Sequence, residues 1–401
     1  MQTISYDYVV KDGEMLEFFA ASYFQTLEYF VESNLKWIED KVDDSGKADV
    51  LELDILAKIF KHDEIEITLT ECKRGCTFND LFKFAGITQL VSSDINILLC
   101  QSHDLAELIS IGSRMNLQVL TPEELLKNIN NDEIIIKFEL FMKVNELCNE
   151  ILSKEKIRGI LRGKGKLQPN EIKAYNKIRA YLSILIGKVW REYDCVKRVN
   201  WINSLLSEYK DFVREIARMI EIKPGNKSSE YYMNKNVLCQ AAGYLVLKIK
   251  ISYIICAVEC AIKLSDNELC KVNDEVLKKV IKKLKENIDL AIKIPKFIQY
   301  FIYIFGGVYS EIDGDIENIS NYIQESEGDV KKIITMLKEL FSMELIGIQW
   351  GFTEDMGVFS LKYIPTPIKG IGMENRELFK FSIDSFCFAD QWKKSIEIWR
   401  R

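Results

Sequence analysis

The sequence predicts an α+β protein, with a compact N-terminal core of strands and helices followed by a larger, mainly α-helical region that ends in a β-hairpin. The first observation is a pair of strand-like runs, 50–60 and 65–73, in which polar and apolar residues alternate. This period of two is typical of half-buried strands. The second is a series of helical patterns from about residue 130 onward, with apolar residues three and four apart. The third is a return to strand-like runs near residue 350.

Around the two strand-like runs, the N-terminal part alternates between helical and extended patterns. A short polar turn at 61–64 joins the two runs, so we expect them to be adjacent and antiparallel. Thr121 and Pro122 are a favoured N-cap and first helical residue, and they begin a further helix. The predicted bounds of the other elements are helix 13–21, helix 78–91, strand 95–100, helix 104–115 and strand 117–120.

Three charged residues interrupt the two strand-like runs. Asp54 lies in the first run, and Glu71 and Lys73 end the second. Residues two apart on a strand point to the same face, and a hairpin can bring Asp54 close to Glu71 and Lys73. Two carboxylates and an ammonium are costly to bury together unless a divalent cation is shared. Oxygen ligands suit Mg²⁺, and a bound metal activates water and neutralises charge on a phosphate.

The segments Leu53-Asp54 and Glu71-Cys72-Lys73 resemble the PD-(D/E)XK motif of the restriction-endonuclease-like superfamily. Seventeen residues separate Asp54 from Glu71, which suits two adjacent strands and a turn, and leucine stands where the family name has proline. The resemblance covers roughly residues 10–128. It implies a nuclease domain over residues 1–130 with an αβββαβ-type core.

The resemblance also implies a function: metal-dependent hydrolysis of nucleic acid, with DNA favoured over RNA, in restriction, repair or antiviral defence. Asp54, Glu71 and the main-chain carbonyl of Cys72 would hold Mg²⁺ or Mn²⁺, and Lys73 would act on the attacking water and the transition-state charge. Glu17 matches the acidic position that many members carry on the first helix, where it would complete the metal environment.

Two alternatives stay open. The charged residues could be ordinary solvated strand residues, which is how most such charges behave. The chain could also be a catalytically silent nuclease-fold protein that binds nucleic acid or mediates assembly through its helical region. Cutting both strands at one place takes two active sites, so a homo-oligomer is one expected assembly, and a partner subunit that supplies a sensor or an ATPase is another.

Charge is distributed unevenly along the chain. Acidic residues outnumber basic ones about two to one in residues 1–128, whereas the remainder has a small basic excess. We therefore expect the second part to make most contacts with nucleic acid. Its strongest candidate is the glycine-containing basic segment 154–166, and Gln89 is a further candidate in the core. The candidate phosphate-contacting residues of this segment are Lys154, Lys156, Arg158, Arg162, Lys164 and Lys166. A solvated linker explains the segment equally well.

Residues 131–314 are predicted to form an α-helical domain, with 231–264 and 272–294 each forming one helix. In residues 315–401, a helix at 329–341 and strand-like runs at 344–351 and 358–364 resemble a winged-helix domain, with a further strand at 379–386.

The ten cysteines are scattered, and the chain shows no secretory signal, so we expect reduced thiols in a cytoplasmic protein. With two histidines, neither a zinc site nor a histidine-based triad is favoured. The charge-free stretches 237–247 and 297–310 are too short to span a bilayer, which takes about 20 apolar residues. We therefore expect no membrane association.

Overall fold

The computed structural model describes several stretches of the chain, and the account below is confined to them. They are residues 13–40, 47–101, 105–127, 129, parts of 134–145, 194–201, 251–304, 316–341, 348–353 and 358–363. The chain divides into two compact units. One comprises Met1–Ile59 and Ile65–Glu146, and the other comprises the rest of the chain.

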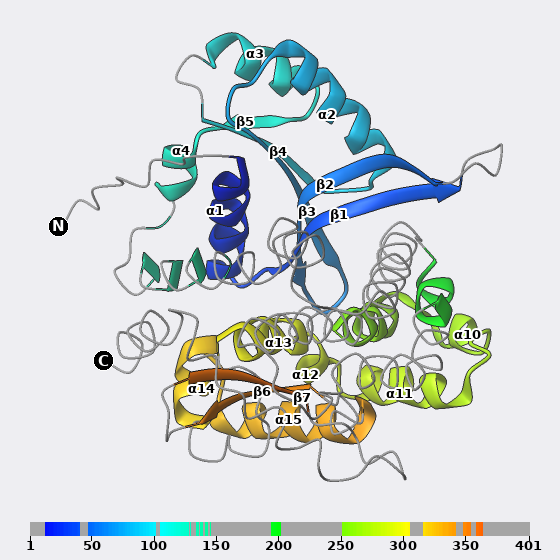
Figure 1. The fold of residues 1–401 in the computed structure, drawn as a ribbon. Helices are drawn as coiled ribbons and strands as arrows, with labels where there is room; N and C mark the ends of the chain where they lie inside the picture. The colour runs from blue at the N-terminus through cyan, green and yellow to red at the C-terminus, as the bar shows by residue number, and fades with distance from the viewer. Residues whose placement is uncertain are drawn as a thin grey trace, which may run out of the picture. The chain divides into compact units, whose positions relative to one another are not determined.

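The first unit is built around a mixed five-stranded sheet with the strand order β1-β2-β3-β4-β5 (Figure 1). Its strands are β1 Phe30–Asp40, β2 Lys47–Phe60, β3 Ile65–Lys73, β4 Ile95–Cys100 and β5 Gln118–Leu120. Strands β1 and β2 are antiparallel, whereas β3, β4 and β5 run parallel. The adjacent strands β2 and β3 are joined by four residues, a length that allows only an antiparallel pair. With its helices, the described part of the chain is α+β, as predicted.

Helices cover both faces of this sheet. The apolar face of α1 (Gly13–Thr26) forms the main core with alternate residues of four strands, and Figure 1 shows α2 (Phe78–Leu90) and α3 (Ala106–Arg114) on the other side. The core residues shared by α1 and the strands are Leu16, Phe19, Ala20, Phe24, Val31, Ile55, Ala57, Cys72, Ile97 and Leu99. Because strand side chains alternate, the remaining residues of β2 and β3 face the α2 side.

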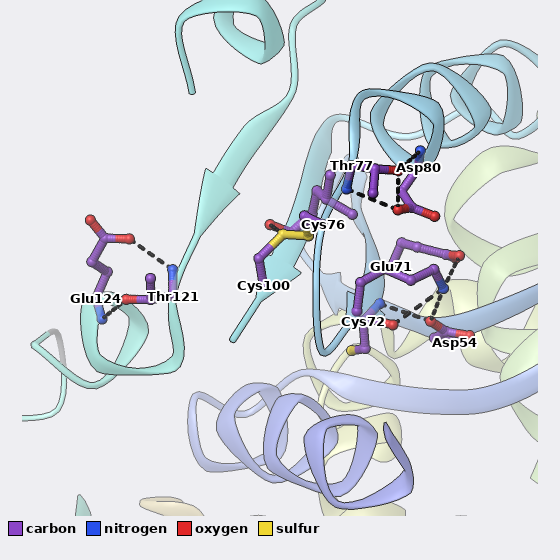
Figure 2. Close-up of a disulfide and its surroundings, with 11 residues drawn as sticks. Asp54, Glu71, Cys72, Cys76, Thr77, Asp80, Cys100, Thr121 and Glu124 are labelled. Carbon is purple, nitrogen blue, oxygen red and sulfur yellow. Dashed lines mark hydrogen bonds and ion pairs between the residues drawn. A yellow bond between two sulfur atoms is a disulfide. The ribbon is translucent and has the colours of Figure 1, made fainter. Parts of the chain in front are cut away.

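Two threonines cap the N-termini of helices, and the cap at Thr121 is the one that the sequence predicts. The Thr77 hydroxyl accepts a hydrogen bond from the Asp80 amide, and the Asp80 carboxylate accepts one from the Thr77 amide. Thr121 and Glu124 form the same capping box at the start of α4 (Pro122–Leu126). These boxes satisfy amides that a helix leaves unpaired at its first turn. Figure 2 shows both pairs.

The described residues of the second unit form helices and one antiparallel hairpin. Its helices are α10 Asp266–Leu269, α11 Glu275–Glu286, α12 Ile288–Ala291, α13 Ile294–Ile304, α14 Ile316–Ile323 and α15 Glu327–Phe341. The hairpin consists of β6 (Ile348–Thr353) and β7 (Val358–Tyr363). No helix among the described residues is long and apolar enough to cross a bilayer.

The prediction of a single helix over 272–294 is wrong. The structure ends α11 before Asn287, whose φ of −128° and ψ of 43° are not helical. The Asn287 side-chain amide donates to the carbonyl of Lys283 at 2.9 Å, and its backbone N–H bonds Leu284. Local bonding of this kind competes with the helix, although the apolar pattern continues through the break.

Several predicted elements lie outside the described residues. They include the basic segment 154–166, most of the helix 231–264 and the strand 379–386. Of 231–264, residues 251–263 are described and are helical. The domain boundaries at 130 and 314 stay predictions.

Candidate functional site

Asp54, Glu71 and Lys73 meet on the α2 side of the sheet, as the hairpin geometry predicts. The Lys73 ammonium (Nζ) lies 2.6 Å from Glu71 Oε1 and 3.7 Å from Asp54 Oδ2. Both carboxylates are buried, with Asp54 8% and Glu71 5% exposed, whereas the Lys73 side chain is 28% exposed. Figure 2 shows the two acids turned toward one another from adjacent strands. One cation therefore contacts both carboxylates.

The backbone of Cys72 completes this cluster. Its N–H donates to Asp54 Oδ2 at 2.8 Å, and its carbonyl accepts from Lys73 Nζ at 3.2 Å (Figure 2). The Cys72 side chain points the opposite way, into the core under α1, where its thiol lies 3.9 Å from the carbonyl of Leu16. The Cys72 side chain therefore packs in the apolar core, while its backbone bonds the side chains of Asp54 and Lys73 on the other face of the sheet.

The pKa values of the two acids are both raised. Burial raises the pKa of Asp54, against lowering by the hydrogen bond from Cys72 and the charge of Lys73. Burial also raises the pKa of Glu71, and the Asp54 charge adds to it. For Lys73, burial lowers the pKa, but its hydrogen bond to Glu71 and the charges of both acids outweigh this and leave the pKa raised. Burial therefore disfavours the charged form of both acids, and the Lys73 ammonium partly offsets this effect.

The donor atoms fit a hard divalent cation. Lys73 Nζ is surrounded by Glu71 Oε1, Asp54 Oδ2 and the Cys72 carbonyl oxygen, which are the same three groups that the motif assigns to a metal. Oxygen-only ligands suit Mg²⁺ and Mn²⁺. Within the described part of the chain, no group of three or more His, Cys, Asp or Glu side chains could hold a metal. A metal here would depend on two side chains, one backbone oxygen and water.

The structure describes some of the other predicted site residues and not others. Glu17 lies on α1, and its charge adds to burial and to the Asp54 charge in raising the pKa of the Cys72 thiol. Gln89 is exposed near the end of α2. Residues 154–166 lie outside the described residues. The roles given to all of them stay predictions.

Two residues near the cluster were missed by sequence reasoning. Lys83 on α2 is exposed, and its charge opposes the rise in the pKa of Glu71 and adds to the lowering of the pKa of Asp80. Asn34 has a φ of +55° within β1. The register pairs Ser33 with Ile55 and Leu35 with Leu53, so Asn34 falls between these two pairs at the level of Asp54. Lysine on an exposed helix face is too common to signal a site, but an Asn amid strand residues could have suggested the left-handed backbone.

We expect Asn34→Val to destabilise the protein by about 1–2 kcal/mol, because a β-branched residue pays the full cost of a left-handed backbone. At an ordinary exposed strand position, valine would be neutral or favourable. Asn34→Gly should stay near wild type, since glycine adopts this φ without strain. Urea unfolding measures both variants. A valine variant as stable as wild type would contradict the left-handed geometry.

Asp54 and Glu71 should lower the free energy of unfolding of the metal-free protein as pH rises. Their folded pKa values are raised above the ordinary 3.8 and 4.5. Between the unfolded and the folded pKa values, the folded state therefore binds more protons than the unfolded state, and the protein loses stability as pH rises through this range. Glu52 faces Asp54 as a further acid, whereas Lys73 and Lys83 face Glu71 as cations. Urea titrations from pH 4 to neutral should show a less negative slope for the Asp54→Asn, Glu71→Gln double variant. Identical slopes would contradict the shifts.

One disulfide lies beside the cluster. Cys76 and Cys100 are bonded, with their Cα atoms 5.9 Å apart (Figure 2). The expectation of reduced thiols is therefore wrong for these two residues, because parallel pairing of β3 and β4 brings together cysteines 24 residues apart. The free thiols among the described residues are those of Cys72, Cys195, Cys256, Cys260 and Cys270.

No protein-family model, curated protein or solved structure matches this chain. The candidate site is therefore defined by its own geometry and by the motif in the sequence.

Proposed function

We propose that this chain is a metal-dependent nuclease that hydrolyses phosphodiester bonds, with DNA favoured over RNA. The observation that carries the proposal is the convergence of Asp54, Glu71 and the Cys72 carbonyl on a single cation, the Lys73 ammonium. Buried acids that share one lysine and have raised pKa values are typical of functional sites. The element order α1-β1-β2-β3-α2-β4 supports the likeness to the restriction-endonuclease-like core.

In this proposal the two carboxylates and the Cys72 carbonyl hold Mg²⁺ or Mn²⁺. Such an ion, when bound, lowers the pKa of a water and neutralises charge on the phosphate. Lys73 then holds the attacking water or the phosphate oxygen that gains negative charge. Water adds to phosphorus, the bond from phosphorus to the 3′ oxygen breaks, and the products are a 5′-phosphate and a 3′-hydroxyl. Asp54 keeps the β3 backbone in place through the Cys72 N–H.

The helices and hairpin of the second unit support a further proposal for residues 315–401. The segment runs from α14 and α15 into the antiparallel pair β6–β7, which is the element order of a winged helix. A winged helix there would contact nucleic acid or mediate assembly.

The direct test combines cleavage with metal binding. Purified full-length protein is incubated with single-stranded, double-stranded and supercoiled DNA and with RNA, in Mg²⁺, in Mn²⁺ or in a chelator. We expect cleavage with either metal and none in the chelator. We also expect Mn²⁺ to raise the melting temperature, because ligand binding to the folded state stabilises it. Absence of both effects would contradict the proposal, whereas binding of nucleic acid without metal binding or cleavage would favour the silent assembly protein.

A further inference from the structure

The Cys76–Cys100 disulfide is attached to the same backbone that carries Lys73. Cys100 ends β4 and is the register partner of Lys73 in the parallel β3–β4 pair. The next amide, that of Gln101, donates to the Lys73 carbonyl at 3.2 Å. Cys76 follows Lys73 by three residues and immediately precedes Thr77, the N-cap of α2. The disulfide therefore fixes the connection between Lys73 and α2 to the end of β4.

The connection itself has few other restraints. Arg74 and Gly75 are exposed, and a Cβ added at Gly75 would meet nothing within 4 Å. Beyond Cys76, the Thr77–Asp80 capping box holds the chain, and Asp80 is within the electrostatic reach of Lys73. Opening the disulfide would leave Lys73 connected to α2 through an exposed, glycine-containing segment. The position of the Lys73 ammonium depends on that backbone.

The two cysteines differ in exposure. Cys100 is fully buried, whereas Cys76 is partly exposed. Thiol–disulfide exchange needs an attacking thiolate to reach one sulfur along the S–S direction. We therefore expect attack at the Cys76 sulfur, with Cys100 as the leaving group. Disulfides in reducing compartments are mostly of this reversible kind, whereas most structural disulfides belong to oxidising ones.

We propose that Cys76 and Cys100 form a reversible oxidation site, opened by a small thiol such as glutathione, that determines how firmly Lys73 is held beside Glu71. A glutathione thiolate attacks Cys76 Sγ, the S–S bond breaks, and Cys100 leaves as a thiolate that takes up a proton. A second glutathione thiolate attacks the mixed disulfide and releases Cys76, which also takes up a proton. In total, two thiols are oxidised to glutathione disulfide while the protein gains two electrons and two protons. The effect on cleavage rests on the proposed nuclease function, but the effect on Lys73 does not.

The test measures the reactivity of Lys73 in the native full-length protein. Oxidised protein and protein treated with excess glutathione are exposed briefly to an amine-acylating reagent, and modification of each lysine is quantified by mass spectrometry. We expect several-fold faster acylation of Lys73 after reduction, because a less confined ammonium leaves Glu71 more often. Lys61, which pairs with Glu64 at the exposed turn of the same hairpin, is the internal control and should not change.

Variants separate the effect of opening the disulfide from other effects of the added glutathione. Cys76→Ser should show fast Lys73 acylation without glutathione, and Cys270→Ser, which changes an exposed free cysteine, should respond as wild type does. If Cys76→Ser does not fold, Cys100→Ala and reduced wild type supply the same comparison. A disulfide that stays closed in excess glutathione, or Lys73 reactivity that is equal in all forms, overturns the proposal.

Cleavage assays of the same samples distinguish this proposal from the previous one. Slower cleavage by the reduced protein and by Cys76→Ser supports both. A change in Lys73 reactivity without cleavage by any form supports the oxidation site and contradicts the nuclease. Cleavage that is equal in all forms, with unchanged Lys73 reactivity, contradicts only the oxidation site.

Discussion

Lys73→Ala is expected to lower the rate of metal-dependent cleavage by on the order of 10² or more, as does loss of other groups that stabilise transition-state charge. The change removes the ammonium that contacts Glu71 and Asp54 but keeps both carboxylates and the Cys72 carbonyl. Affinity for nucleic acid should change little if most phosphate contacts lie elsewhere. Single-turnover kinetics with saturating Mg²⁺ separate the two effects.

Lys61→Ala is the matched control for this experiment. Lys61 also pairs with a carboxylate on the same hairpin, at 2.9 Å from Glu64, but both side chains are exposed. Exposed pairs of this kind contribute about 0–1 kcal/mol, so cleavage and stability should stay near wild type. Equal cleavage by wild type and Lys73→Ala would place the activity at another site or in a contaminant.

The second large effect is expected at Asp54. Both Asp54→Asn and Asp54→Ala should abolish measurable cleavage and weaken Mn²⁺ binding, because each removes one of two carboxylate ligands. Calorimetric titration with Mn²⁺ measures the binding directly. A variant that binds Mn²⁺ as tightly as wild type would show that the metal lies elsewhere.

The two Asp54 variants should differ in stability. Asparagine keeps an oxygen that can accept the Cys72 N–H and removes a buried charge whose pKa burial has raised, so Asp54→Asn should be at least as stable as metal-free wild type. Alanine leaves that buried N–H without its acceptor, a loss of about 1–3 kcal/mol. Equal stability of the two variants in urea would contradict a structural role for this hydrogen bond.

Much of the first unit could be predicted because its elements have strong local signals. The alternation in β2 and β3 and the threonine cap of α4 correspond to the observed elements. The strand β1 was not located, since its sequence mixes acids, Asn34 and aromatic residues without a clean period of two. β1 lies at the sheet edge and pairs with β2 alone. Its sequence lacks the nearly continuous apolar run of a strand that is buried on both faces.

The candidate site could likewise be predicted only in part. Asp54, Glu71 and Lys73 follow from strand period and one short turn, which are local properties of the sequence. The disulfide does not, because the pairing of Cys76 with Cys100 depends on β4 lying parallel to β3 after an intervening helix. The influence of Lys83 on Glu71 likewise depends on where α2 packs, which no spacing rule supplies.

The connection between β2 and β3 has a consequence for the accuracy of strand alignment. The two carboxylates and the backbone carbonyl proposed to hold the metal come from residues 54–72, and a single four-residue turn sets how the two strands align. A slip by one residue would turn Glu71 and Lys73 into the apolar core beneath α1 and bring the Cys72 thiol to the polar side. Such a slip buries two charges and exposes a core residue at once. Misalignment at the site would therefore destabilise the apolar core. The residues packed under α1 thus favour the one alignment that brings the polar cluster together.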